Sequence, residues 1–323
     1  MAKILVAGKI PEIGLELLKD HDVEMYDKEE LISIDELTER VKDKDALLSL
    51  LSTKVPKEVI DAAPHLKIVA NYGAGYDNID YKYAGEKGIA VTNTPKVSTE
   101  ATAELTFALL LAAARRIPEG DTLCRTTGFN GWAPLFFLGR EVHGKTIGII
   151  GLGEIGKAVA KRAKAFGMDV LYTGPNRKLE AESELGATYV MLEELLQTAD
   201  FITINCAYNP KLHHMIDEEQ FKMMKKTAYI VNASRGPIMN EAALAHALKT
   251  NEIEGAALDV FEFEPKITEE LKELKNVVLA PHVGNATFET RDAMAEMAVR
   301  NILAVLNGEE PVTPVNQMVL VTK

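Results

Sequence analysis

Three residues that can carry acid–base and anion-binding chemistry follow separate apolar runs of the sequence. Arg235 comes after TAYIVNAS, Glu264 comes after AALDV, and His282 closes NVVLAPH. In an open parallel sheet, the carboxyl ends of neighbouring strands face one crevice, where ligands bind. An arginine is permanently charged and matches a carboxylate, whereas a histidine exchanges protons near neutral pH and a glutamate stabilises its protonated form. Each has an ordinary explanation alone, but together they predict one catalytic group.

A glycine-rich segment, Gly151-Leu-Gly-Glu-Ile-Gly156, follows the apolar run TIGII. Gly151 permits a tight turn, Gly153 lets the backbone approach a pyrophosphate, and Gly156 lets a helix pack on the sheet. The helix expected over Glu154–Phe166 then points its N-terminus at the phosphates. A strand before this segment and a helix after it favour a dinucleotide site over a structural turn. With the three residues above, it predicts hydride transfer to an anionic carbonyl compound.

The end of the next strand bears on the choice of cofactor. A site for NAD expects an acidic residue about 20 residues past the glycine loop, bonded to the ribose. The sequence here is Thr173-Gly174-Pro-Asn-Arg177-Lys178, without an acidic residue. Arg177 and Lys178 can bind a 2′-phosphate, so NADP(H) is favoured and NAD(H) remains possible. The alternative is that both are ordinary solvated charges.

Two other motifs suggest binding sites. The pair His213-His214 has no further ligand at a suitable spacing in the sequence, so we expect a solvated loop and no metal. Gly73-Ala74-Gly75 ends a strand but lacks the third glycine of a nucleotide loop. It is either a plain turn or a turn that offers backbone amides to an anion.

Bulk properties limit the class of protein. A chain of 323 residues is too long for one typical core, so two domains are expected. The net charge of -12 argues against nucleic acid and anionic membranes as partners. Cys124 and Cys206 form no paired motif, and the N-terminal apolar run is too short for a signal peptide. We therefore expect a cytoplasmic protein.

Apolar strands alternate with helical stretches along most of the chain, which predicts α/β units with parallel sheets. A buried helix should run from Ser98 or Thr99 to about Arg116, residues 120–145 should be irregular and aromatic, and 288–306 should be helical. Eleven strands are expected, at 4–7, 23–26, 46–50, 67–71, 89–92, 146–150, 169–173, 201–205, 228–232, 256–260 and 277–280.

At these residues the sequence resembles the D-isomer-specific 2-hydroxyacid dehydrogenases over essentially its whole length. The motifs are NYGAGYDNID at 71–80, NTP at 93–95, GLGEIG at 151–156, NASRG at 232–236, ALDVFEFEP at 257–265 and APHVG at 280–284. Within that family it is similar to glyoxylate/hydroxypyruvate reductases, through WAPLFFLG at 132–139 and LYTG at 171–174.

The resemblance implies two Rossmann-like parallel-sheet domains with the cleft between them. A flavodoxin-like substrate-binding domain would comprise residues 1–98 and 288–323, and a dinucleotide-binding domain residues 99–287. In this family the residue at Arg235 holds the substrate, Glu264 is the partner of the histidine, and His282 is the acid/base.

The resemblance also implies binding residues. The amides of Ala74 and Gly75 would hold the substrate carboxylate, and Leu51 would lie near the substrate side chain. Asp259 would lie by the nicotinamide amide. The positions implied near the cofactor are Thr102, Glu154, Ile155, Cys206, Ala233, Asp259 and Gly284. Cys206-Ala207 departs from the family, where a residue followed by proline is common.

The aromatic segment 129–139 would lie at a twofold dimer interface, with Phe136 reaching the partner's substrate pocket. The expected activity is reduction of small 2-keto acids, such as glyoxylate or hydroxypyruvate, to D-2-hydroxy acids with NAD(P)H. One alternative is a reductase of sugar acids such as 2-ketogluconate. Another is a cofactor-sensing binding protein, as the corepressors of this fold are, although the sequence has no long basic or disordered extension.

Overall fold

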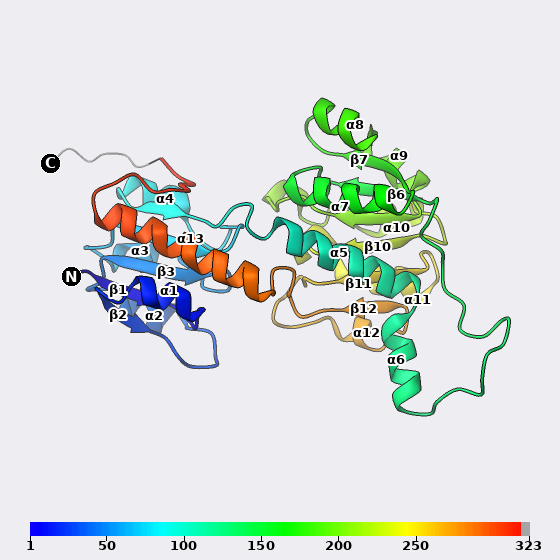
Figure 1. The fold of residues 1–323 in the computed structure, drawn as a ribbon, viewed down its shortest axis with the longest axis horizontal. Coiled ribbons are helices and arrows are strands. Elements are labelled where there is room, and N and C mark those ends of the chain that lie inside the picture. Colours follow the sequence, from blue (N-terminus) through cyan, green and yellow to red (C-terminus); the bar gives the residue numbers. More distant parts are fainter. Residues whose placement is uncertain (318–323) are drawn as a thin grey trace. The chain divides into compact units, whose positions relative to one another are not determined.

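The computed structural model describes residues 1–317 and divides into two compact units. Unit 1 comprises residues 1–98 and the chain from Asn285 onward, and unit 2 comprises Thr99–Gly284 (Figure 1). Each unit has a parallel sheet with helices on both faces, so the predicted α/β fold with two parallel-sheet domains is confirmed. Residues 318–323 of the predicted substrate-binding domain lie outside the described part of the chain.

The sheet of unit 1 has five parallel strands in the order β2-β1-β3-β4-β5. This order reverses direction between β1 and β3, as in flavodoxin-like sheets, where ligands bind at the carboxyl ends of the strands. Apart from the edge strand β2, the strands are mostly apolar, as expected for a sheet covered on both faces. They are β1 (Lys3–Val6), β2 (Asp22–Met25), β3 (Ala46–Leu50), β4 (Ile68–Tyr72) and β5 (Ala90–Thr92).

The long C-terminal helix α13 (Phe288–Leu306) completes the core of unit 1. It packs with α1 (Glu12–Leu17) on one face of the sheet, and the Tyr72 hydroxyl donates to the Arg291 carbonyl at 2.7 Å (Figure 1). The opposite face is covered by α2 (Ile34–Arg40), α3 (Lys57–Asp61) and α4 (Tyr81–Glu86). The predicted helix at 288–306 is confirmed, and its packing partner comes from residues more than 200 positions earlier in the chain.

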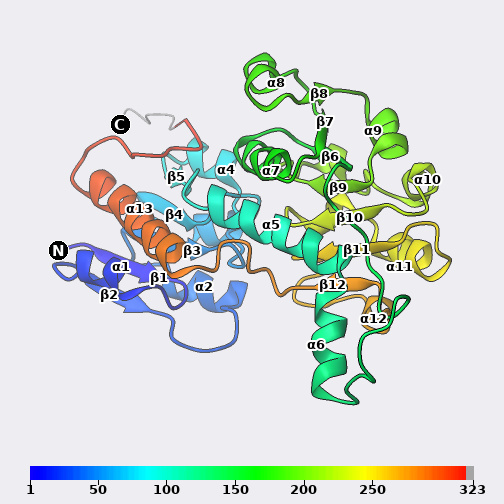
Figure 2. The ribbon, with the colours of Figure 1, turned by 45° about the vertical axis from the view of Figure 1, so that its right-hand side comes forward.

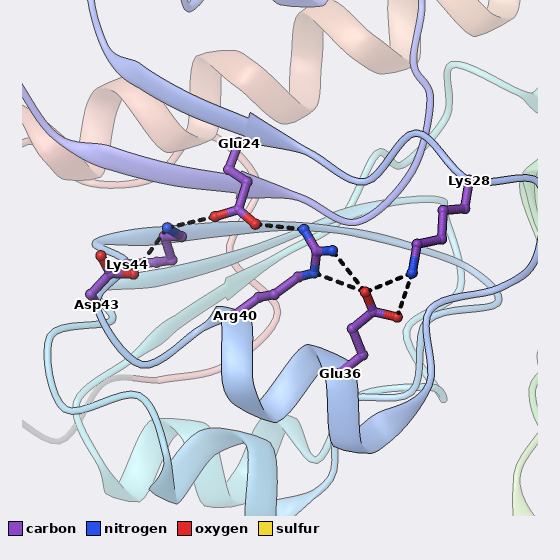
Figure 3. A network of polar contacts seen from close by, with 6 residues as sticks. All are labelled: Glu24, Lys28, Glu36, Arg40, Asp43 and Lys44. Atoms are coloured by element: carbon purple, nitrogen blue, oxygen red, sulfur yellow. Dashed lines mark hydrogen bonds and ion pairs between the residues drawn. The ribbon is translucent and has the colours of Figure 1, made fainter.

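A network of charged side chains joins α2 to the edge strand β2 (Figure 3). Arg40 contacts Glu24 at 2.6 Å and Glu36 at 2.7 Å, and Lys28 adds a second contact to Glu36 at 3.0 Å. Lys44 joins Glu24 at 2.8 Å. These contacts lie at the surface, where solvent weakens ion pairs, so they tie the edge strand to its neighbours without forming a ligand site.

The sheet of unit 2 has seven parallel strands in the order β12-β11-β10-β9-β6-β7-β8. All eleven predicted strands of the chain are present, and β8 is the strand that sequence reasoning missed. It has two residues, too few to show a periodic pattern. The strands are β6 (Thr146–Ile150), β7 (Asp169–Thr173), β8 (Thr188–Tyr189), β9 (Phe201–Ile204), β10 (Tyr229–Asn232), β11 (Gly255–Leu258) and β12 (Val277–Leu279).

Helices cover both faces of this second sheet. On one face lie α5 (Thr99–Ala114), which is largely buried as predicted, and α7 (Glu154–Ala165) (Figure 1). The helix α8 (Leu179–Leu185) follows β7. The other face carries α9 (Leu192–Thr198), α10 (Glu218–Met223), α11 (Glu241–Lys249) and α12 (Glu269–Lys272).

The segment after α5 differs in part from the sequence prediction. A separate helix, α6 (Ile117–Arg125), occupies the start of the stretch expected to be irregular. Pro118 lies in the first turn of this helix, where a missing N–H costs nothing. Figure 2 shows α6 and the chain after it extending away from the rest of unit 2. Among the described residues, no helix has the length and apolarity needed to cross a membrane.

Candidate active site

Arg235, Glu264 and His282 come from three adjacent strands of unit 2. They follow β10, β11 and β12, which pair in register so that Asn232 lies beside Leu258 and Leu258 beside Leu279. The three strands therefore end at one level of the sheet. The sheet topology thus places the three predicted residues on segments that leave the same edge.

Glu264 and His282 form a direct pair. The His282 Nδ1 lies 2.9 Å from the Glu264 Oε2, and the Phe261 N–H donates to the Glu264 Oε1 at 2.9 Å. Burial opposes the charged form of Glu264, but these contacts and the charge of Arg235 outweigh it and hold the pKa of Glu264 below its ordinary value. The carboxylate is therefore ionised at neutral pH. Because Nδ1 is engaged, Nε2 is the ring nitrogen that can exchange a proton with a ligand.

The backbone that carries Arg235 is held by its neighbours. The Asn232 side chain donates to the Arg235 carbonyl at 3.0 Å and accepts from the Ser234 N–H at 3.1 Å. The next residue, Gly236, packs against Phe261 so closely that a Cβ would lie 1.9 Å from the Phe261 carbonyl carbon. Glycine is therefore required there, and the segment bearing Arg235 lies directly on the segment that leads to Glu264.

Asp259 positions the loop that carries His282. Its carboxylate accepts the N–H of Val283 at 2.7 Å and that of Gly284 at 2.8 Å, and it is almost fully buried. Burial raises the pKa of Asp259, and the two N–H contacts oppose that shift. His282 has a left-handed backbone with φ of 54°, an uncommon conformation that these contacts help to hold. The sequence placed Asp259 near the cofactor and missed this positioning role.

The glycine loop is closely packed at Gly151 and Gly156 and open at Gly153. Gly151 has φ of 96°, and a Cβ there would lie 2.7 Å from the Cys206 nitrogen; a Cβ on Gly156 would lie 2.2 Å from the Gly151 carbonyl oxygen. Gly153, by contrast, has nothing within 4 Å of a Cβ and stands at the N-cap of α7 without a side-chain cap. The start of α7, with Glu154 and Ile155, thus combines room with backbone donors suited to an anion.

Residues 107–284 match the NAD-binding domain of the D-isomer-specific 2-hydroxyacid dehydrogenases. This match covers more than half of the chain, and it includes the glycine loop and all three residues of the Arg235, Glu264 and His282 group. The chain belongs to this family. It is therefore an oxidoreductase with an NAD(P)-binding domain.

Relatives similar over the whole length support this membership. A Staphylococcus aureus (strain MRSA252) protein, provisionally named a 2-hydroxyacid dehydrogenase, is 67% identical and covers 98% of this chain and 100% of its own. The NADPH-dependent glyoxylate/hydroxypyruvate reductase of Sinorhizobium meliloti, solved with NADP and malonate, is 33% identical with a TM-score of 0.84 and covers 98% and 97%. A glyoxylate reductase of Paecilomyes thermophila is 32% identical with a TM-score of 0.87 and covers 98% of each.

Other positions implied near the cofactor cluster around these strand ends. A Cβ on Gly284 would lie 3.1 Å from Asp259 and 3.4 Å from Thr102, so these three residues of the dehydrogenase lie together. Ala233 is buried directly after β10. The Ser234 hydroxyl donates to the Cys206 carbonyl, which ties the end of β10 to the end of β9.

Two neighbouring residues at the end of β9 have different properties. Burial raises the pKa of the Cys206 thiol to about 11, so this sulfur is neutral and unreactive at neutral pH. Both polar atoms of the Asn205 side chain are buried and have no hydrogen-bond partner among the described residues. A buried amide with neither atom paired is rare, and sequence reasoning did not single out this residue.

The helix after β7 carries an acidic residue, Glu182, whose contact with Arg177 sequence reasoning missed. Glu182, on α8, contacts Arg177 at 2.6 Å and 3.1 Å and accepts from the Tyr172 hydroxyl at 2.6 Å. Residues 173–178 hold no acidic side chain, and Glu182 instead lies on the following helix, where it pairs with Arg177. Lys178 is exposed, and a Cβ on Gly174, which follows Thr173, would meet nothing within 4 Å.

In unit 1, the glycine segment and Leu51 are held together. The Asn71 side chain donates to the Gly75 carbonyl at 2.6 Å, and the Asn93 side chain donates to the Ala74 carbonyl at 2.6 Å. A Cβ on Gly73 would lie 2.2 Å from a methyl carbon of Leu51. Two buried asparagines thus fix the peptide planes of the segment. Asn71 lies in the motif at 71–80 and Asn93 in the motif at 93–95, but their role in holding this segment was not inferred from the sequence.

The segment after α6 exposes large apolar side chains. Trp132 is 87% exposed and Leu135 is 84% exposed. Phe136 stacks on Phe129 with ring centroids 6.2 Å apart and lies tilted against Phe137 at 5.8 Å. An apolar surface of this kind usually marks an interface. The interface and the predicted reach of Phe136 into a partner's pocket stay predictions.

Proposed function

We propose that this enzyme reduces small 2-keto acids, such as glyoxylate or hydroxypyruvate, to D-2-hydroxy acids with NAD(P)H. The observation that carries the proposal is the pair of Glu264 and His282, at 2.9 Å, beside the charge of Arg235. A proton donor paired with an ionised carboxylate suits reduction of a carbonyl. The two glyoxylate reductases among the similar structures support the same substrate class.

In this proposal each of the active-site residues of unit 2 has a separate role. The reduced nicotinamide, when bound, supplies a hydride to the keto carbon. Arg235 binds the substrate carboxylate through its planar guanidinium group and polarises the carbonyl. Nε2 of His282 donates a proton to the forming alkoxide, and Glu264 stabilises the ring while it carries that proton. Asp259 acts indirectly, by holding the backbone of the loop that presents His282.

The substrate-binding role of unit 1 is also part of the proposal. The amides of Ala74 and Gly75 bind the substrate carboxylate, and Leu51 limits the size of the substrate side chain. Support comes from the two asparagines that hold this segment and from the close packing of Leu51 on Gly73. Preorganised amides stabilise an anion more strongly than amides that must reorient.

For the cofactor we favour NADP(H), with NAD(H) possible. Arg177 and Lys178 follow β7 and carry the positive charge that a 2′-phosphate requires. Glu182 competes for Arg177, so part of that charge is already neutralised. We therefore expect a preference for NADPH rather than exclusion of NADH.

We also propose a cytoplasmic homodimer of twofold symmetry. The exposed apolar residues of the segment 129–138 support an interface, and a closed twofold pair is the commonest symmetry. Phe136 would then help to wall the substrate pocket of the partner. Sedimentation at assay concentration is the measurement: a fully active monomer would exclude this arrangement.

A substrate panel tests the activity. Oxidation of NADPH and NADH is followed with glyoxylate, hydroxypyruvate, pyruvate, phenylpyruvate and 2-ketogluconate. We expect the highest kcat/KM with glyoxylate or hydroxypyruvate. A maximum with 2-ketogluconate would move the enzyme to the sugar-acid reductases. Cofactor binding without turnover of any of these acids would point to a sensing protein instead.

A further inference from the structure

A second group of ligating side chains lies in unit 2, apart from the Glu264–His282 pair. His213 and His214 follow a short 3-10 turn (Pro210–Leu212), and their rings stack with centroids 4.0 Å apart. Glu262 joins them from the loop after β11, with Oε1 2.6 Å from the His214 Nε2. One ligand atom from each residue lies within 4.8 Å of the others. His213 is exposed, as expected for a solvated loop, whereas His214 is only partly exposed and pairs with Glu262.

We propose that His213, His214 and Glu262 bind a divalent transition-metal ion of the zinc class. Two imidazoles and one carboxylate form a donor set that suits Zn²⁺, and three protein ligands leave a fourth position for water. Two ligand atoms at about 2.0–2.2 Å from a tetrahedral ion lie about 3.4 Å apart. The His214 Nε2 and Glu262 Oε1, now 2.6 Å apart, therefore separate slightly through small side-chain rotations to admit the ion. His213 is exposed and open to an ion from solvent.

The backbone around these ligands is held by other contacts. His214 has a left-handed backbone with φ of 52°, and its N–H donates to the Pro237 carbonyl at 2.9 Å. Ile216 continues this contact with an N–H bond to the Ile238 carbonyl at 3.1 Å. Glu262 has a side chain that is only 9% exposed, and its carboxylate faces the His214 ring. Both segments are therefore placed before an ion arrives, which reduces the entropy that binding must overcome.

The placement of the site predicts that metal binding stabilises the folded protein. Gly236 packs on Phe261, and the next residue, Pro237, accepts the His214 N–H. The turn at Gly236–Ile238 thus joins the histidine loop to the loop that carries Glu262. An ion held by both segments would bind the folded chain and not the unfolded one. Mass action then raises the temperature of unfolding as the metal concentration rises.

The test is a titration of the full-length protein with Co²⁺, whose visible absorption reports coordination, followed by displacement with Zn²⁺. We expect saturation at one ion per chain and a rise of the unfolding temperature with Zn²⁺. The variant His213→Ala removes an exposed ligand without disturbing the buried contact, and it should weaken binding at least about tenfold. Glu262→Gln should weaken binding as well.

The matched control is His65→Ala, an exposed histidine of unit 1, which should bind the ion as the unchanged protein does. His282→Ala should also keep the ion, which separates this site from the proposed active site. Absence of saturable binding would overturn the proposal. Equal affinity in the protein and its His213→Ala variant would do so too, as would binding that disappears only with His282→Ala.

Discussion

Two histidine–carboxylate pairs share the short loop after β11, and they use opposite nitrogens of the imidazole ring. Glu264 engages the Nδ1 of His282, whereas Glu262 engages the Nε2 of His214. The first pair therefore leaves the Nε2 of His282 available to a ligand, whereas the second pair uses the Nε2 of His214 within the protein. The Glu264 side chain is 35% exposed and the Glu262 side chain 9%. The same two residue types thus suit proton transfer in one place and structural or metal contacts in the other.

The largest expected effect comes from removing the available nitrogen. His282→Ala should lower kcat by roughly 10²–10⁴, the usual contribution of general acid–base catalysis, while cofactor affinity changes little. His214→Ala should affect kcat far less, since its outer nitrogen faces Glu262. Steady-state rates and cofactor fluorescence titrations measure both quantities. Similar losses of kcat in the two variants would remove the distinction between the pairs.

The variant Glu264→Gln tests the pairing of Glu264 with His282 through the pH dependence of the rate. The pKa of Glu264 lies below its ordinary value, so the carboxylate is charged at neutral pH. The stability that its contacts contribute is therefore lost only when the pH falls through that lowered pKa. Without the charge, protonation of His282 becomes harder, so reduction should fall off at lower pH than in the unchanged enzyme. A pH–rate profile that does not move would contradict the pairing.

Glu262→Ala should act on stability more than on catalysis. It leaves the His214 ring without its partner in a half-buried place, and we expect the free energy of unfolding to fall by about 1–3 kcal/mol. Urea unfolding measures this change. A loss of kcat as large as that of His282→Ala, with unchanged stability, would show that Glu262 belongs to the reacting group.

A third charged pair, Arg177 with Glu182, lies after β7 and tests the proposed contact of Arg177 with the cofactor. Arg177→Ala should raise the KM for NADPH roughly tenfold and the KM for NADH much less, because only NADPH carries the 2′-phosphate. Glu182→Gln should lower the KM for NADPH, by a smaller factor, since it releases Arg177 from its ion pair. Glu180→Gln on the same helix is the control. Equal changes with both cofactors would mean that Arg177 faces solvent.

The smallest effect is expected in the surface network of unit 1 (Figure 3). Arg40→Ala removes two ion pairs, but solvent screens them, so the free energy of unfolding should fall by about 1 kcal/mol or less. Activity should be unchanged. If the free energy of unfolding fell as much as in Glu262→Ala, solvent exposure would not be the property that separates structural from functional ion pairs in this protein.

The sequence by itself determined eleven strands in their order, the glycine loop and the three residues of the proposed active site. Apolar runs and glycine spacing are local patterns, so the eleven predicted strands and the helix at 288–306 needed no knowledge of the fold. Parallel-sheet topology then sufficed to place Arg235, Glu264 and His282 at one edge. The short strand β8 and the helix α6 were missed because two residues carry no period and a proline can begin a helix.

Only the tertiary structure decided which side chains meet. Glu182 returns to Arg177 through a helical turn, Asp259 reaches the loop of His282 across 24 residues, and Glu262 reaches His214 across 48. None of these contacts has a signature in the spacing of the sequence, because each depends on how loops from different strands pack. The chemistry of a charged side chain is set by its contacts and burial, and these exist only once the chain has folded.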